Sequence, residues 1–133
     1  MAAPTPTTYS RQVGHYGFSI WSGLWAGTGE FTATALVDVS GLADGYTSSV
    51  KLLRCIIQTT AGISALLEFD ATANQFIAKS SIGNVNDVDI NFCDNTDYGL
   101  VKTASGSTGD IVLTTLSAAA ADEVTVYLWW YAN

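Results

Sequence analysis

Residues 111–115, Ile-Val-Leu-Thr-Thr, and residues 123–131, Glu-Val-Thr-Val-Tyr-Leu-Trp-Trp-Tyr, are the two stretches that decide the fold. Both are rich in β-branched and aromatic residues, and both are bounded by Gly, Ser, Ala and Asp, which is typical of strands joined by turns. They predict that the chain closes with two strands of a β-sheet. The aromatic cluster at the end of the second stretch must be covered, and another subunit could provide that cover.

Upstream, apolar and polar residues alternate with a period of two in several short segments separated by turn residues, at 16–20, 31–39, 63–69 and 88–93. Segment 50–58 is apolar on both faces, which predicts a central strand covered on both sides. No segment of helical period is long enough to matter. The number and spacing of these segments predict an all-β fold, an antiparallel β-sandwich of jelly-roll-like type with eight or nine short strands.

Two regions of the chain are distinguished by composition. Residues 1–12 hold both prolines and a run of Thr without periodicity, which predicts an extended N-terminal arm, either disordered or docked on a neighbouring subunit. Residues 13–133 have the length of one domain with one core, and we predict a single β-sandwich domain there.

Charged residues make up only 13% of the chain, against about 25% in a typical soluble domain. A surface so poor in charge is less protected against association, which suits a protein that works in an assembly. Acidic residues outnumber basic ones twelve to five, and the basic residues are scattered singly. This pattern argues against a nucleic-acid partner and against an anionic membrane.

Two further patterns bear on the cellular compartment. No apolar run approaches the roughly 20 residues of a membrane-spanning helix. The first residues lack the basic and apolar regions of a signal peptide, so nothing marks the chain for export. Cys55 and Cys93 lie within apolar strand patterns and are predicted to be free thiols.

Few residues suggest catalysis. His15 is the single histidine, so a catalytic triad or a multi-histidine metal site would have to be built around it. Glu68 with Asp70, and Asp87 with Asp89, place two carboxylates on one strand face, as glycosidases do, but a solvated acidic face produces the same pattern. We predict that the protein is not an enzyme.

The sequence also gives little reason to expect a cofactor. Asp87, Asp89, Asp94, Asn95 and Asp97 supply hard oxygen ligands for calcium, but without the spacing and the fixed glycine of a helix-loop-helix calcium site. The glycine-rich stretch 106–109 has neither the lysine nor the spacing of a phosphate-binding loop. No cofactor and no metal site are predicted.

The aromatic residues at 21, 25 and 129–131 fit a sugar-stacking platform or packing in a core or subunit contact. We favour packing, because a sugar site usually adds convergent charged or amide groups and none lies beside these residues. Trp130 shares a strand face with Val124, Val126 and Leu128 and is predicted in the core, whereas Trp129 points the other way. The predicted interface residues are Pro4, Pro6, Tyr9, Arg11, Trp21, Trp25, Trp129 and Tyr131.

Four stretches in a fixed order carry a resemblance to a known family. They are Gly29-Glu30 leading into Val-Asp-Val-Ser-Gly-Leu at 37–42, Ala-Leu-Leu-Glu-Phe-Asp-Ala-Thr at 65–72, Thr-Gly-Asp-Ile-Val-Leu-Thr-Thr at 108–115, and Asp-Glu-Val-Thr-Val-Tyr-Leu at 122–128. Together they resemble small tailed-bacteriophage virion proteins encoded next to the major capsid protein. Trp129-Trp130-Tyr131 departs from that pattern, which would have a basic finish.

The resemblance implies a capsid decoration protein, also called a cement or head auxiliary protein. Such a protein is a β-sandwich, commonly a homotrimer, that binds the major capsid protein on the outer surface of the virion. It would be made and assembled in the bacterial host cytoplasm. The family supplies no catalytic or ligand residues. The alternative is a carbohydrate-binding or adhesion module on a phage particle or tail, and a glycosidase comes third.

Overall fold

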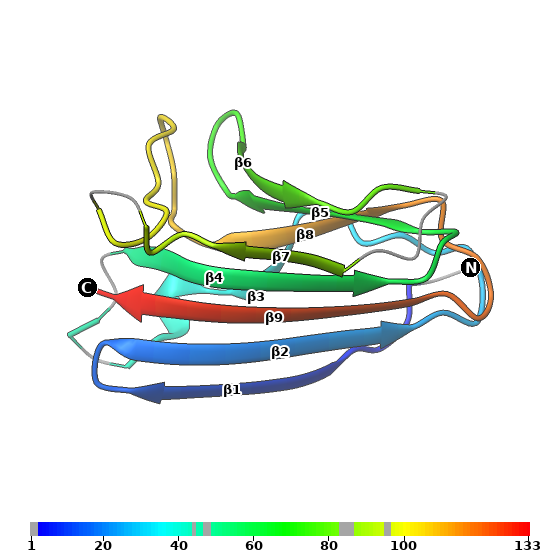
Figure 1. Cartoon of the computed structure of the whole chain (residues 1–133), viewed down its shortest axis with the longest axis horizontal. Helices are drawn as coiled ribbons and strands as arrows, with labels where there is room; N and C mark the ends of the chain where they lie inside the picture. The colour runs from blue at the N-terminus through cyan, green and yellow to red at the C-terminus, as the bar shows by residue number, and fades with distance from the viewer. Residues whose placement is uncertain (1–2, 44, 47–48, 83–86, 95–96) are drawn as a thin grey trace.

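The computed structural model describes residues 3–43, 45–46, 49–82, 87–94 and 97–133 of the 133-residue chain. The described residues form nine strands and one turn of 3-10 helix, η1 (Val39–Gly41). Figure 1 shows how the strands are arranged. The strands are β1 (Thr7–Val13), β2 (Tyr16–Leu24), β3 (Thr34–Val37), β4 (Val50–Thr59), β5 (Ser64–Phe69), β6 (Gln75–Lys79), β7 (Asp87–Asn91), β8 (Ile111–Leu116) and β9 (Glu123–Ala132). None of the described residues forms a helix long and apolar enough to cross a membrane.

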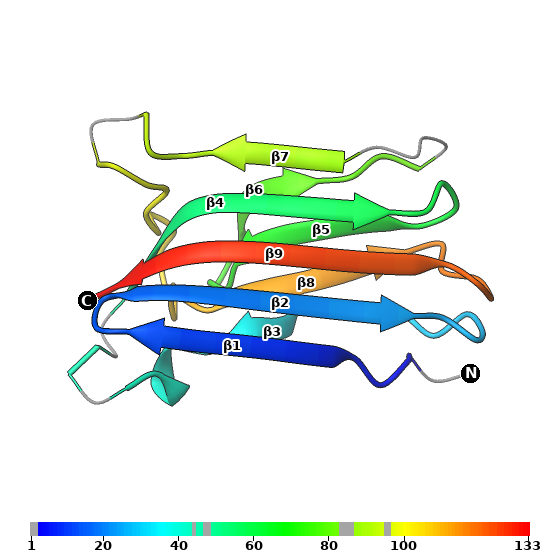
Figure 2. The same ribbon diagram turned by 60° about the horizontal axis from the view of Figure 1, so that its bottom comes forward.

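The strands form two sheets that lie face to face (Figures 1 and 2). One sheet has the order β1-β2-β9-β4-β7 and the other has the order β3-β8-β5-β6. Every strand pairing is antiparallel. The predicted all-β antiparallel sandwich is therefore confirmed.

The pairing of the strands also confirms the jelly-roll topology. The pairs β2 with β9, β3 with β8, β4 with β7 and β5 with β6 are nested inside one another along the chain. Successive pairs alternate between the two sheets. The chain thus follows the path of one long hairpin rolled into a sandwich, which is the jelly-roll arrangement. β1 adds a fifth strand at the edge of one sheet.

β1 comes from the region predicted as an arm. It pairs with β2 over seven residues, from Thr7 opposite Ser22 to Val13 opposite Tyr16. Gly14, with a φ of +59°, forms the turn between the two strands, where a left-handed backbone favours glycine. The structure therefore places residues 7–12, half of the predicted arm, on the chain's own sheet, and the expected boundary after residue 12 falls inside a hairpin.

The core lies between the sheets and contains the inward-facing residues of β9. Val124, Val126, Leu128 and Trp130 are all buried, which confirms the inward orientation predicted for Trp130. The indole of Trp130 crosses Gly17, where a Cβ atom would overlap the ring. Its Nε1 donates a hydrogen bond to Ser19 Oγ at 3.1 Å.

β4 has a bulge that corrects one prediction. The register shifts between Leu52 and Arg54. The side chains that point to the core are therefore at even positions before the bulge and at odd positions after it. This shift accounts for the two-sided apolar pattern of 50–58. Cys55 and Ile57 face the core, whereas Arg54 is exposed on the outer face, so β4 is not covered on both sides within the described chain.

Candidate interaction surface

The outer surface of the five-stranded sheet carries a continuous group of aromatic, aliphatic and basic side chains. Strand register places them in three adjacent rows that run across β1, β2, β9 and β4. We call this surface the aromatic face, and its residues are Tyr9, Arg11, Val13, Tyr16, Phe18, Ile20, Lys51, Arg54, Ile56, Tyr127, Trp129 and Tyr131.

Several large side chains of the aromatic face are open to solvent. Tyr9, Val13 and Tyr16 are 53%, 64% and 62% exposed, and Phe18 and Trp129 are half-buried. The side chains of these five residues and of Arg11 line a groove on the same surface. Single exposed apolar residues are ordinary, but a contiguous patch of them is typical of a binding surface.

The rings of the aromatic face contact one another. Trp129 packs against Phe18, with ring centroids 5.0 Å apart, and lies nearly parallel to Tyr127 at 6.4 Å. The guanidinium of Arg54 lies 5.1 Å from the centre of the Trp129 ring. A sugar ring stacks on an uncovered aromatic face, so these neighbours disfavour Trp129 as a sugar platform.

A second cluster lies around Tyr131. His15 stacks on Tyr131 with ring centroids 4.8 Å apart, and the Lys51 ammonium lies 5.1 Å from the centre of the Tyr131 ring. His15 Nδ1 donates to the backbone carbonyl of Ala132 at 2.7 Å. Together with an edge-on contact to Tyr46, these contacts give the one histidine a packing role at the end of β9.

The charges are divided across the sheet. Arg11, Lys51 and Arg54, three of the five basic residues of the chain, lie on the aromatic face. Asp87 and Asp89 lie at the opposite edge on β7, in the same register rows as Gln58 and Ile56. Arg11 is thus the basic residue of the β1 edge, Asp87 and Asp89 make the β7 edge acidic, and Lys51 and Arg54 lie beside that acidic edge on β4.

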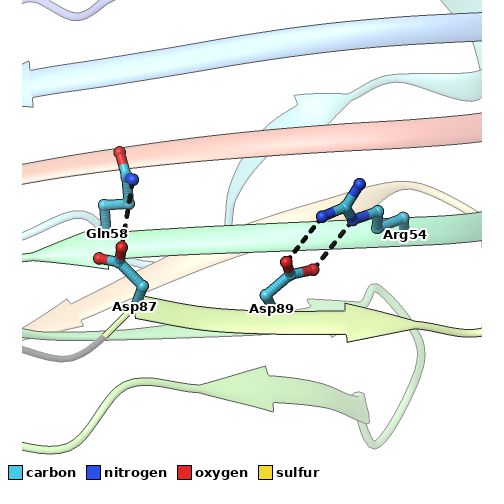
Figure 3. A network of polar contacts seen from close by, with 4 residues as sticks. All are labelled: Arg54, Gln58, Asp87 and Asp89. Carbon is cyan, nitrogen blue, oxygen red and sulfur yellow. Dashed lines mark hydrogen bonds and ion pairs between the residues drawn. The ribbon is translucent and has the colours of Figure 1, made fainter.

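Arg54 and Asp89 form a bidentate ion pair, with Nε–Oδ1 and Nη2–Oδ2 distances of 2.9 and 2.7 Å (Figure 3). Beside it, Gln58 Nε2 donates to Asp87 Oδ2 at 3.4 Å. The hydrogen bonds from Arg54 hold the pKa of the Asp89 carboxyl below its ordinary value, and the same bonds raise the pKa of Arg54. Asp89 is thus a charged partner for Arg54, which is a poor arrangement for a general acid.

The aromatic face unites four of the predicted interface residues, Tyr9, Arg11, Trp129 and Tyr131. Trp21 and Trp25 require a correction, because they are 4% and 2% exposed and belong to the core. Trp21 lies inside β2, and Trp25 Nε1 donates to the Gly29 carbonyl at 2.6 Å. Their side chains pack in the core between the two sheets and are not available to a partner.

The two predicted prolines lie apart from this surface. Pro4 and Pro6 precede β1, and Pro6 lines a separate groove together with Thr34 and Ala35 of β3. Inward-facing residues such as Trp21 and Val126 also line that groove, so it lies toward the space between the sheets and shares only Tyr9 and Ile20 with the aromatic face.

Sequence reasoning missed the outward residues of β2 and β4. Tyr16, Phe18 and Ile20 alternate with small residues, and such apolar alternation ordinarily marks the side facing the core. Here the small residues Gly17 and Ser19 face inward and make room for Trp130. Gly17 on β2 lies opposite the large Trp130 on β9, and this pairing of a glycine with a tryptophan was the signal that could have revealed the orientation.

The other predicted chemical sites are explained by local structure. Glu68 Oε1, near the end of β5, accepts a hydrogen bond from Asn74, and Asp70 Oδ2, just after β5, accepts one from Thr108. Among the described residues no three His, Cys, Asp or Glu side chains are grouped so as to hold a metal ion, and Asn95 lies outside those residues. Cys55 and Cys93 are free thiols, as predicted.

The aromatic face is therefore the strongest candidate for a functional site, and its chemistry is that of a protein contact surface. The sequence matches no protein-family model, and a search among curated proteins returns no significant match.

Proposed function

We propose that this protein is a non-enzymatic structural protein of a phage virion. It acts as a capsid decoration or cement protein, binds the major capsid protein on the outer surface of the shell, and stabilises the shell. The proposal combines the resemblance across residues 29–128 with the jelly-roll fold, an architecture used by viral capsid proteins among others.

The observation that carries the proposal is the aromatic face, because it supports a role as a component of a larger assembly. Trp, Tyr and Arg are the residue types that dominate binding energy in protein interfaces, and all three are gathered on one sheet surface. A chain with few charges and an open aromatic surface is suited to a permanent assembly. We further propose that the chain self-associates, with the trimer implied by the resemblance as the expected state.

Stabilisation of the shell follows from mass action. A protein that binds the assembled shell and not its free subunits lowers the free energy of the shell by RT ln(1 + [L]/Kd) for each site, about 2.7 kcal/mol at a free concentration of 100 Kd. Because many sites are present on one particle, weak individual contacts add to a large total. No chemical step is needed.

Reconstitution on shells of its own virion tests the proposal. Shells that lack the protein are mixed with purified protein, and the bound copy number and the temperature of shell disruption are measured. We expect many copies per shell and a higher disruption temperature. Absence of binding to intact shells at saturating protein would contradict the proposal, and a few copies confined to a tail would favour the carbohydrate-binding or adhesion module.

A further inference from the structure

We propose that the aromatic face is covered by a second copy of this chain, docked so that the β1 edge of one copy lies beside the β7 edge of the other. This inference rests on the self-association in the proposed function and names the surface that mediates it. Shell binding is measured separately, so the two proposals can fail independently.

The area of the face fits a stable protein interface. The five strands average about eight residues, with a rise of about 3.3 Å per residue and a spacing of about 4.8 Å between strands. The face therefore covers roughly 650 Å² in plan, and standing side chains make the accessible area larger. A standard interface uses about 800 Å² on each partner, so one sheet face is sufficient.

The face is also organised before any partner arrives. Phe18, Tyr127 and Arg54 surround Trp129 and restrict its rotation, and His15 and Lys51 do the same for Tyr131. Side chains that are ordered in the free subunit lose less entropy on binding. The same contacts leave the Tyr9 and Tyr16 rings as the more open apolar surface for a partner to cover.

Charge identifies the partner as another copy. Arg11 on β1 and Asp87 on β7 are separated by four strand spacings across the sheet, at least about 19 Å, so the two cannot pair within one chain. When the β1 edge of one copy lies beside the β7 edge of another, Arg11 approaches the Asp87 carboxylate, which among the described residues has only the 3.4 Å hydrogen bond from Gln58, whereas Asp89 is already paired with Arg54. The opposite arrangement, with two β1 edges together, would place two Arg11 side chains side by side. The chain thus carries its own complementary edge.

A charge exchange tests the arrangement. We expect Arg11→Glu and Asp87→Lys each to weaken self-association about tenfold or more, because each creates a like-charge contact across the interface. The double variant Arg11→Glu/Asp87→Lys should restore most of the wild-type affinity. Sedimentation equilibrium measures the affinities. Lys79→Glu is the matched control, because it reverses the charge of an exposed residue on β6 of the other sheet. It should leave self-association unchanged.

An aromatic pair of variants tests the occupant. Trp129→Ala should convert the oligomer to a folded monomer, whereas Phe76→Ala, an exposed aromatic residue on β6, should leave the oligomer intact. The inference is overturned if the wild-type protein is monomeric at high micromolar concentration. It is also overturned if Trp129→Ala stays oligomeric, or if the double variant Arg11→Glu/Asp87→Lys does not regain affinity. An oligomer with these properties that binds no shell would uphold the inference and contradict the decoration function.

Discussion

Gly17 determines which side of β2 turns inward. A Cβ atom at this position would overlap the indole of Trp130, and Ser19, two residues further, accepts the indole N–H. Ser19 Oγ also shares a hydrogen bond with Ser10 Oγ on β1 at 2.9 Å. Small residues at 17 and 19 therefore make room for one large ring from β9. As a consequence, Tyr16 and Phe18 point outward and form part of the aromatic face.

Gly17→Ala should destabilise the fold. The added methyl group must displace Trp130 or the β2 backbone, and overpacking of this kind costs about 1–3 kcal/mol. Urea unfolding measures the change. Gly41→Ala is the control, because the nearest atoms to a Cβ there, on Asp38, are 4.0 Å away. Equal stability of wild type and Gly17→Ala would contradict the position of the Trp130 ring.

The neighbouring tryptophans should behave differently. Trp130→Ala removes a fully buried aromatic side chain and should cost about 3–5 kcal/mol of stability. Trp129→Ala, on the outer face, should cost about 1 kcal/mol or less in the isolated subunit. Denaturant unfolding at low protein concentration separates subunit stability from association. A larger loss for Trp129→Ala than for Trp130→Ala would overturn the assignment of the two faces.

The two thiols should differ in reactivity. Burial, with a smaller contribution from Asp89, raises the pKa of Cys55 to about 11, whereas Cys93 is only half-buried. At pH 8 a disulfide reagent should react with one thiol in the folded protein and with two in denaturant, since the thiolate is the reactive form. Cys93→Ser should remove the reactive thiol of the folded state, and an unchanged count would contradict this prediction.

The raised pKa of Cys55 also gives stability a defined pH dependence. The folded state keeps the thiol protonated up to about pH 11, while the unfolded state releases the proton near its ordinary pKa of 9.0. The contribution is therefore fully present below pH 9 and is lost as the pH rises from 9 to 11. Thermal unfolding of wild type and Cys55→Ala across this interval measures it, and a wild-type slope identical to that of the variant would refute it.

The sequence predicts where strands form better than it predicts which of their side chains face the core. The strands at 111–115 and 123–131 and the acidic-outward strand at 88–93 are found as β8, β9 and β7, because each has a regular local pattern. The outward orientation of Phe18 and the bulge beside Leu52 depend on contacts between distant segments. No window of neighbouring residues contains that information, so eight of the twelve residues of the aromatic face were missed.

β1 is the edge strand whose role the sequence left open. Deleting residues 1–13 should leave the eight nested strands folded, because most of the β1 side chains are exposed. The loss of seven paired residues should lower the melting temperature, and the newly exposed edge of β2 should increase aggregation. Circular dichroism and light scattering measure the two effects. Deletion of residues 1–5, which keeps β1 whole, is the control, and complete unfolding of the longer deletion would contradict the prediction.

Considered as a whole, the molecule has two dissimilar outer faces. The outer surface of the five-stranded sheet holds rings from β1, β2 and β9, whereas on the four-stranded sheet Phe76 is the exposed large aromatic residue among those described. A subunit with one aromatic face has a defined inside and outside in an assembly. With the aromatic face turned toward other copies, the four-stranded sheet and the loops at the ends of the sandwich are left for contacts with a larger particle.

This division predicts that stability depends on protein concentration. If copies bind only in the folded state, association adds RT ln(1 + [L]/Kd), so that a rise in concentration from well below Kd to about 100 Kd stabilises the subunit by about 2.7 kcal/mol. The melting temperature of the wild type should then rise by several degrees over that range, as expected for a domain of this size. Trp129→Ala should melt at the same temperature at every concentration, while Phe76→Ala should follow the wild type. Scanning calorimetry over about three decades of concentration provides the measurement, and a concentration-independent wild type would show that the aromatic face is not covered by a second copy.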